Sequence, residues 1–279
     1  MSSLKETTWK MSKTLIDVVV VGAGPSGLAC AIEAKKYGLS HVILEKGGIT
    51  NSILHFPTQM IFFTTPELLE IGGVPLVSER DKPTRNEALK YYRKVVGAFQ
   101  LDVHQYEEVT AIEQLGSHVF RVRTAASAYD ARNVVLSIGY YDNPNFMNVP
   151  GEDLPHVSHY YTEAHPFFKR DVVVIGGKNS AAEAALDLFR GGARVSLVHR
   201  GAAMGQNVKY WVKPDIENRF KNGEITAYFN ATILEITNDH VKIAQNGDKH
   251  EIPAQHARAQ CVAVFDLNLD FAEEVVVIA

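Results

Sequence analysis

Six residues, Gly22 to Gly27, have the types and spacing of a turn that can bind the phosphates of a dinucleotide. In such a turn the first glycine permits a tight change of direction, the second lets the backbone approach a pyrophosphate, and the third lets a helix pack closely. Glu45, eighteen residues beyond Gly27, stands where a carboxylate accepts hydrogen bonds from an adenosine ribose. The pattern predicts an adenine-dinucleotide site, and an acidic site of this kind suits a tightly held FAD.

The segments on both sides of this turn have the patterns of the elements that must position it. Residues 15–21 are an apolar run rich in β-branched side chains, which is typical of a buried parallel strand. Residues 28–36 have a helical pattern, and residues 41–44 form a second apolar run that ends at Glu45. The start of the helix offers free N–H groups and a partial positive charge to phosphates. This agreement favours nucleotide binding over a turn with a purely structural role.

A second turn of the same kind occupies residues 176–181. It follows an apolar run at 171–175, and the strand pattern after its helix ends at His199 and Arg200. Basic side chains at that place suit the 2′-phosphate of NADP, whereas a solvated strand end is the simpler alternative. Lys178 departs from the pattern because it replaces the second glycine. The predicted NADPH-binding residues are Gly176, Gly177, Lys178, Asn179, Ser180, His199 and Arg200.

Composition excludes several other classes of function. The chain has 279 residues, of which 46% are apolar and 22% charged, with a formal net charge of −4. It has no basic block, so we expect neither nucleic acid nor an anionic membrane surface as a partner. No apolar run approaches the roughly 20 residues that span a bilayer. Residues 1–14 are polar and lack a hydrophobic signal core, so we expect a cytoplasmic protein.

Four motifs occur in the order and spacing of the low-molecular-weight thioredoxin reductases, which the chain resembles. They are Gly22 to Gly27, Ser137 to Gly139, Pro150 to Glu152, and Gly176 to Ala181. Within that group, the chain closely resembles the bacillithiol disulfide reductases (YpdA-type enzymes) in the stretches 51–60, 67–75, 82–92, 139–145 and 151–161. The resemblance runs from about residue 13 to about residue 253. It implies a homodimeric cytosolic flavoenzyme that uses NADPH to reduce a low-molecular-weight disulfide.

The resemblance also implies further contacts with the flavin cofactor. Asn51 and Thr58 would be hydrogen-bond partners of the flavin and its ribityl chain, His55 lies in the same stretch, and Val109 matches the place where the backbone meets adenine. A polar loop without cofactor contact is the alternative. The predicted FAD-binding residues are Gly22, Gly24, Pro25, Ser26, Gly27, Glu45, Lys46, Asn51, His55, Thr58, Val109 and Gly139.

The expected fold class is α/β, with two Rossmann-like doubly wound dinucleotide-binding domains, the NADPH domain being inserted in the FAD domain. The turn at Pro150 to Asp153 marks the passage between them. We expect a flexible N-terminal tail at 1–14, an FAD-binding domain at 15–150, an NADPH-binding domain at 151–253, and an atypical or truncated return segment at 254–279. The resemblance stops after residue 254, and the segment that follows lacks the glycine–aspartate motif of the family.

The chain differs from its relatives at the positions of the redox cysteines. Tyr160 and Glu163 stand where thioredoxin reductases have a CxxC pair, and Ser26 stands where bacillithiol reductases have a single cysteine. Serine cannot form a mixed disulfide, because exchange requires attack by a thiolate. Cys30 lies one helical turn further on, where core packing is the favoured role and a displaced redox thiol the weaker alternative. We expect a structural role for Cys261.

Three functions remain in competition at this point. The first is NADPH-dependent reduction of a small disulfide through flavin, with the catalytic residues unassigned. The second keeps the transfer from NADPH to flavin but delivers electrons to ferredoxin, a quinone or oxygen. The third is a nucleotide-binding relic whose incomplete FAD domain no longer catalyses. A metal site is not expected, since the histidines of residues 156–165 have no acid or cysteine at ligand spacing.

Overall fold

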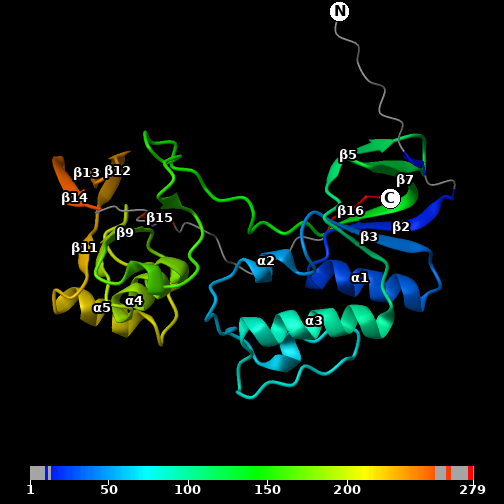
Figure 1. Cartoon of the computed structure of the whole chain (residues 1–279), viewed down its shortest axis with the longest axis horizontal. Coiled ribbons are helices and arrows are strands. Elements are labelled where there is room, and N and C mark those ends of the chain that lie inside the picture. The colour runs from blue at the N-terminus through cyan, green and yellow to red at the C-terminus, as the bar shows by residue number, and fades with distance from the viewer. Residues whose placement is uncertain (1–9, 12–13, 255–261, 265–275, 279) are drawn as a thin grey trace, which may run out of the picture. The chain divides into compact units, whose positions relative to one another are not determined.

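The computed structural model describes residues 10–11, 14–254, 262–264 and 276–278. Contacts divide these residues into two compact units, and Figure 1 labels the elements of each. The first unit contains residues 14–55 and Gln59–Asp142, together with strands β1 (Lys10–Met11) and β16 (Val276–Ile278). The second contains Phe56–Thr58, residues 143–254 and strand β15 (Val262–Val264).

The first unit is built on a mixed sheet whose central strand precedes the first glycine turn. The strands are β2 (Ile16–Val21), β3 (His41–Glu45), β4 (Val103–Gln105), β5 (Val109–Gln114), β6 (Phe120–Thr124) and β7 (Ser127–Leu136). Their order is β4-β3-β2-β7-β6-β5, and the first four run parallel. Val19 and Val20 of β2 are fully buried, as expected of a parallel strand that is covered on both faces. The carboxyl ends of β3, β2 and β7 therefore meet at one edge.

Helices pack on this sheet and bring the first turn to that edge. They are α1 (Pro25–Lys36), α2 (Asn51–Leu54) and α3 (Arg85–Phe99), with a 3-10 turn η1 at Pro66–Leu68. Figure 1 shows α1 between the sheet and α3. Thr84 and Glu87 close the start of α3 as a capping box, in which each side chain accepts from the other residue's backbone N–H. Hydrogen bonds from the backbone N–H groups of Thr84 and Glu79, together with the hydroxyls of Thr84 and Ser78, lower the pKa of Glu87 to about 2.

The second unit has a parallel sheet and a smaller antiparallel one. The parallel strands are β8 (Val157–Ser158), β9 (Asp171–Ile175), β10 (Arg194–Val198), β11 (Thr226–Tyr228) and β15, in the order β11-β10-β9-β15-β8. The antiparallel strands are β12 (Ala231–Ile236), β13 (His240–Gln245) and β14 (Asp248–Pro253). Helices α4 (Asn179–Arg190) and α5 (Lys213–Lys221) share one apolar core with the parallel sheet, and a 3-10 turn η2 lies at His165–Phe167.

Most of the expected elements are confirmed, and two differences have physical causes. The apolar pattern of residues 133–138 also predicts a strand, which is β7. β7 starts earlier than predicted, at Ser127, because polar residues such as Asp130 alternate with buried ones where β7 pairs antiparallel with β6. Lys10 and Met11, expected in a flexible tail, form β1 beside Ser127 and Ala128. That part of β7 extends beyond its pairing with β2, which begins at residue 131, so its backbone groups can accept another strand. Within the described ranges, no helix has the length and apolar character needed to cross a membrane.

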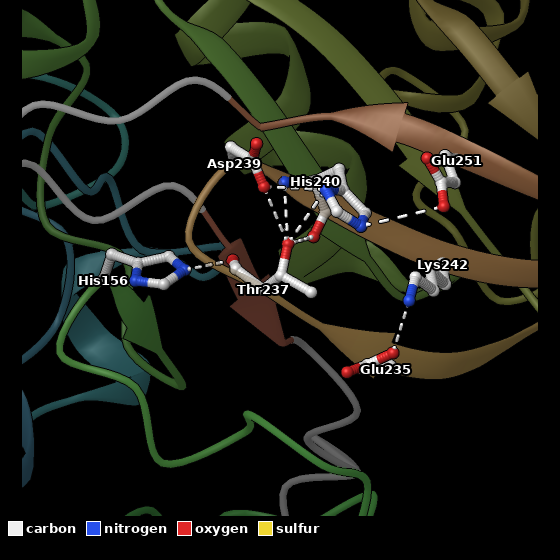
Figure 2. Close-up of polar contacts among 7 residues, drawn as sticks. All are labelled: His156, Glu235, Thr237, Asp239, His240, Lys242 and Glu251. Atoms are coloured by element: carbon white, nitrogen blue, oxygen red, sulfur yellow. Dashed lines mark hydrogen bonds and ion pairs between the residues drawn. The ribbon is translucent and has the colours of Figure 1, made fainter.

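The turn between β12 and β13 holds the segment that follows residue 149. The N–H of Ile236 donates to the carbonyl of Pro150 at 2.9 Å, and Nε2 of His156 lies 2.9 Å from the carbonyl of Thr237. Figure 2 shows this contact beside the hydrogen bonds that Thr237 makes with Asp239 and His240. His156 is buried and points at a backbone oxygen, so the structure gives it a positioning role in the fold.

Glu152 fixes the other side of the same segment. Its carboxylate accepts from the backbone N–H groups of Met147 and Asn148 at 2.9 and 2.7 Å, and Nε2 of His159 lies 3.0 Å away. Burial works against ionisation, but these contacts outweigh it and hold the pKa of Glu152 below its usual range. Gly151 has a φ of +84°, and a Cβ there would lie 1.9 Å from the carbonyl oxygen of Ile236. The motif at residues 150–152 therefore holds the backbone in a fixed turn.

Candidate dinucleotide-binding sites

Two of the three glycines in the first turn are required by the protein itself. Gly22 has a φ of +103°, and a Cβ there would lie 2.3 Å from the carbonyl oxygen of Ser137. A Cβ on Gly27 would lie 2.0 Å from the carbonyl oxygen of Gly22. These distances are far too short for carbon and oxygen, so a side chain at Gly22 would push the turn away from the end of β7, and a side chain at Gly27 would push the helix away from the turn.

Gly24 is different, and its surroundings test whether a nucleotide fits. Its φ of −72° suits any residue, and no atom of the described residues lies within 4 Å of where its Cβ would be. Neither backbone conformation nor packing therefore requires glycine at this position. Gly24 also forms the N-cap of α1, whose first turn has no cap from a described side chain. An open surface at the N-terminus of a helix is what a pyrophosphate needs.

Glu45 lies at the end of β3 and reaches into the turn. It is only 6% exposed, Oε2 accepts from the backbone N–H of Ala23 at 2.7 Å, and Oε1 accepts from that of Gly47 at 2.8 Å. Two backbone donors fix the carboxylate, and each oxygen keeps a second lone pair that can accept a hydroxyl. The N–H of Glu107 donates to the Glu45 carbonyl at 2.8 Å, which brings the segment leading to Val109, the first residue of β5, to the same edge.

The segment after β3 folds back over the turn through α2. The N–H of Thr50 donates to the carbonyl of Ala23 at 3.0 Å, and Oδ1 of Asn51 accepts a long bond of 3.4 Å from Gly48. Nδ1 of the exposed His55 lies 2.8 Å from the carbonyl of Asn51, and the hydroxyl of Tyr141 donates to the carbonyl of His55 at 3.0 Å. This fold-back brings Asn51 and His55 to the edge of the sheet that holds Gly22 and Glu45.

The remaining predicted FAD residues occupy varied places. Lys46 forms an ion pair with Asp142 at 2.9 Å, and Gly139 is exposed with a φ of +61°. Pro25 is the first residue of α1. Thr58 belongs by its contacts to the second unit, where its N–H donates to the carbonyl of Thr162 at 2.9 Å.

Ser26 and Cys30, the two positions that bear on thiol chemistry, both lie in the first half of α1. Ser26 lies in the first turn of the helix and Cys30 one turn further on, half-buried. Burial raises the pKa of the Cys30 thiol, which reduces the thiolate fraction that exchange requires. This favours the packing role for Cys30. Cys261 lies outside the described residues.

Tyr161 is a functional candidate that sequence reasoning missed. It lies between Tyr160 and Glu163, is buried, and its hydroxyl donates to the carboxylate of Asp187 in α4. Burial and this carboxylate raise the pKa of Tyr161. The contact fixes the stretch where thioredoxin reductases have their CxxC pair against the helix of the second glycine turn. A lone tyrosine in a loop has no periodic signal that could have revealed it.

In the second turn, a ring takes the place of the carboxylate. Gly176 has a φ of +146°, and a Cβ on Gly177 would lie 2.3 Å from Cε1 of His199. The imidazole therefore lies directly over the backbone of Gly177, as the Glu45 carboxylate reaches Ala23 in the first turn. Arg200 follows and is exposed. The structure thus brings His199 to the turn from which it is separated in sequence.

The start of α4 lies at a candidate anion site and also contacts the loop of residues 199–212, which joins β10 to α5. Lys178 is the N-cap, contributing no side-chain cap that the structure describes, and Ser180 is partly buried in the first turn. Oδ1 of Asn179 accepts from the N–H of Lys209 at 2.9 Å and Nδ2 donates to the carbonyl of Asn207 at 3.2 Å. The Asn179 amide is therefore engaged by the loop, which indicates a role in holding that loop over the turn.

Lys209 completes this closure and was not expected from the sequence. Its Nζ lies 2.6 Å from a carboxylate oxygen of Glu183, and the N–H of Gly205 donates to the carbonyl of Gly177 at 2.8 Å. The loop has no helical or strand periodicity, so only the contacts reveal its role. Among the residues that the structure describes, no group of three or more histidine, cysteine or acidic side chains is arranged to hold a metal ion.

Two glycine turns, each at the end of a parallel strand and one with an acid and one with a base at the following strand end, define an oxidoreductase of the two-dinucleotide class. Comparison with known proteins agrees with this class. The family described as pyridine nucleotide-disulphide oxidoreductase matches residues 19–277. Bacilliredoxin reductase Bdr of Bacillus subtilis (strain 168) is 39% identical over 257 residues, which are 92% of this chain and 79% of that protein.

Solved structures give the same answer. Bacillithiol disulfide reductase Bdr (YpdA) from Bacillus cereus superimposes with a TM-score of 0.85 at 41% identity, over 90% of this chain and 77% of that one. A thioredoxin reductase of Lactococcus lactis, at 19% identity and a TM-score of 0.71, shares the fold. The chain belongs to the pyridine nucleotide-disulphide oxidoreductase family. The expected fold class and the expected enzyme class are thereby confirmed: it is an oxidoreductase that uses a flavin and a nicotinamide nucleotide.

Proposed function

We propose that the chain binds FAD in its first unit, takes hydride from NADPH bound in its second, and reduces a low-molecular-weight disulfide similar to bacillithiol disulfide. The names of the relatives from Bacillus subtilis and Bacillus cereus support the substrate class. The observation that carries the cofactor assignment is the contrast between Glu45, whose carboxylate reaches the first turn, and His199, whose imidazole lies over the second.

The chain's own groups are arranged to bind and orient the two nucleotides. The N-terminus of α1 and the open surface at Gly24 would receive the FAD pyrophosphate, while the remaining lone pairs of the Glu45 carboxylate would accept its ribose hydroxyls. At the second turn, His199 and Arg200 would meet the 2′-phosphate of NADPH. When bound, nicotinamide and flavin supply the hydride and electron transfer, which needs no protein acid or base in its first half.

The position of Ser26 determines how the substrate is reduced. A serine hydroxyl cannot exchange with a disulfide, and the raised pKa of Cys30 disfavours its thiolate. We therefore infer that reduction proceeds without a covalent adduct at either residue. Because this inference removes the usual link to disulfides, transfer to ferredoxin, a quinone or oxygen is the second candidate. We further propose, as the resemblance implies, that the protein is cytoplasmic and forms a homodimer. Sedimentation equilibrium would test the homodimer.

An anaerobic titration tests the proposal. The protein is purified with FAD, its visible spectrum is recorded, and NADPH or NADH is added under nitrogen. We expect a flavin band that NADPH bleaches faster than NADH, and recovery of the band on adding bacillithiol disulfide. Recovery with ferredoxin, a quinone or oxygen, but not with disulfides, would establish the second candidate. A protein that takes up no flavin would refute both and favour the nucleotide-binding relic.

A further inference from the structure

One ion pair lies across the edge of the first sheet where the FAD site is proposed. Lys46 directly follows β3, and Asp142 comes six residues after the end of β7. In the sheet, β2 lies between these two strands. The pair therefore joins the two segments that leave the strands on either side of β2, which are about 9.6 Å apart at the usual spacing of about 4.8 Å between neighbouring strands. Nζ and Oδ2 lie 2.9 Å apart.

The end of β2 is also where the glycine turn begins. Gly22 follows β2 directly, and the open surface at Gly24 lies two residues further on. Lys46 is the neighbour of Glu45, the predicted ribose ligand, so one end of the ion pair stands beside the adenosine half of the cofactor. The other partner, Asp142, lies in the segment that follows β7, which is on the other side of β2 from β3. A dinucleotide bound over the turn from β3 towards β7 would therefore lie close to this pair.

Both partners are attached to rigid parts of the first unit. Glu45 is buried and held by two backbone N–H groups, which fixes the backbone at Lys46. Tyr141 is buried and bonded to the carbonyl of His55, which fixes the backbone at Asp142. The hydrogen bond with Asp142 raises the pKa of Lys46, so the lysine remains charged at physiological pH. The side chains themselves are partly exposed, at 47% and 25%, and can separate without unfolding.

We propose that the Lys46–Asp142 ion pair is a clasp that retains FAD in the first unit and opens for its release. The proposal rests on the assignment of FAD to that unit. It differs from a role of Lys46 as a direct ligand of the pyrophosphate, because the clasp needs both partners and acts on the rate of release. A direct ligand would instead bind the cofactor better once Asp142 no longer competes for it.

The two roles predict opposite effects of one substitution on the rate of FAD dissociation. Asp142→Asn breaks the clasp, so we expect FAD to dissociate about fivefold faster, as the loss of a partly exposed ion pair allows. If Lys46 were a direct ligand, the same substitution would free it and slow dissociation. Lys46→Met should match Asp142→Asn, and the charge-exchanged variant Lys46→Asp with Asp142→Lys should restore slow release.

The experiment measures the rate at which flavin fluorescence appears when the FAD-loaded protein is diluted to a concentration far below its dissociation constant for FAD, so that released FAD does not rebind. Asp130→Asn is the matched control, because Asp130 forms a bidentate ion pair with Arg121 in the same unit, about 20 Å from the end of β7. Raising the salt concentration should speed release from the wild type and the control but not from the clasp variants.

Three results would overturn the proposal. Equal rates in wild type, Asp142→Asn and Lys46→Met would show that the pair does not retain the cofactor, and slower release from Asp142→Asn would show direct binding. Equal acceleration by Asp130→Asn would indicate a general loss of stability. None of these depends on disulfide reduction, so the clasp can fail while the proposed enzyme activity stands. Failure of the wild type to hold flavin at all would refute the clasp together with the cofactor assignment.

Discussion

The two glycine turns share a backbone design and differ in what closes them. In the first, the strand after the helix ends at Glu45, whose carboxylate accepts from the N–H of Ala23. In the second, the equivalent strand ends at His199, whose ring lies over Gly177. The second residue of each turn suits the side chain that contacts it. Ala23 needs only to donate its N–H to the Glu45 carboxylate, whereas the His199 ring leaves no room for a Cβ at Gly177. The residue at the strand end thus determines both the turn sequence and the charge offered to a ligand.

The third glycine position offers the strongest test of this comparison. Gly27 is replaced in the second turn by Ala181, which is fully buried there. Gly27→Ala would place a Cβ 2.0 Å from the carbonyl oxygen of Gly22, so we expect a loss of about 1–3 kcal/mol in unfolding free energy and little bound flavin. Urea denaturation and the flavin absorbance of the purified protein would measure both.

The reverse substitution is the matched control for the turn. Ala181→Gly removes a methyl group from a helix and should cost about 1 kcal/mol without affecting flavin content. Equal flavin loss in both variants would mean that the two turns are not specialised as described.

Glu45→Gln tests the acidic closure of the first turn. The variant keeps the shape of the side chain but turns one acceptor into a donor that faces a backbone N–H. Hydrogen bonds to charged groups are worth about 1.5–3 kcal/mol, so we expect FAD to bind about 10- to 100-fold more weakly. Fluorescence titration of the apoprotein with FAD gives the affinity. An unchanged affinity would exclude Glu45 as a ribose ligand.

His199→Glu tests the basic closure by giving the second turn the acid of the first. A carboxylate near the 2′-phosphate is repelled, and like charges in contact cost several kcal/mol, so the preference for NADPH over NADH should fall at least about tenfold. The ratio of kcat/KM for the two nucleotides in flavin reduction measures it. Lys221→Ala, which removes an exposed cation at the end of α5, should leave the ratio unchanged.

The capped helix α3 gives the smallest expected effect. Its capping box closes an N-terminus that α1 and α4 leave to a ligand, so Glu87→Ala should cost about 1 kcal/mol of stability without affecting cofactor binding. The pKa of Glu87 is lowered to about 2, so its contribution is complete above the ordinary value of 4.5 and is lost as the pH falls from there towards 2. Urea midpoints of wild type and variant should therefore converge between pH 5 and pH 2.

The sequence predicted the parts of the fold whose patterns are local. Parallel strands such as β2 and β9 are short continuous apolar runs next to glycine, so both were located within a residue of their ends. The small sheet β12–β14 was not predicted, because its antiparallel strands rely on pairing with one another and β14 is mostly polar. The beginning of β7 escaped notice for the same reason.

The candidate sites divide in a similar way. Glu45 and His199 could be found by counting residues from a glycine turn, since strand and helix lengths are fixed by the fold. Lys209, Tyr161 and Asp142 could not, because each reaches its partner through a loop whose course depends on long-range contacts. No local pattern encodes such a contact.

The pairing of β16 with β7 has a consequence for the order in which the chain folds. Residues 134–136 of β7 pair with β16 on the side that β6 covers only as far as residue 131. During synthesis, this stretch emerges from the ribosome long before residues 276–278, and all of residues 143–254 are made in between. An open strand edge is a template for pairing with other chains. The nascent first unit is therefore most exposed to misassembly while the second is being translated.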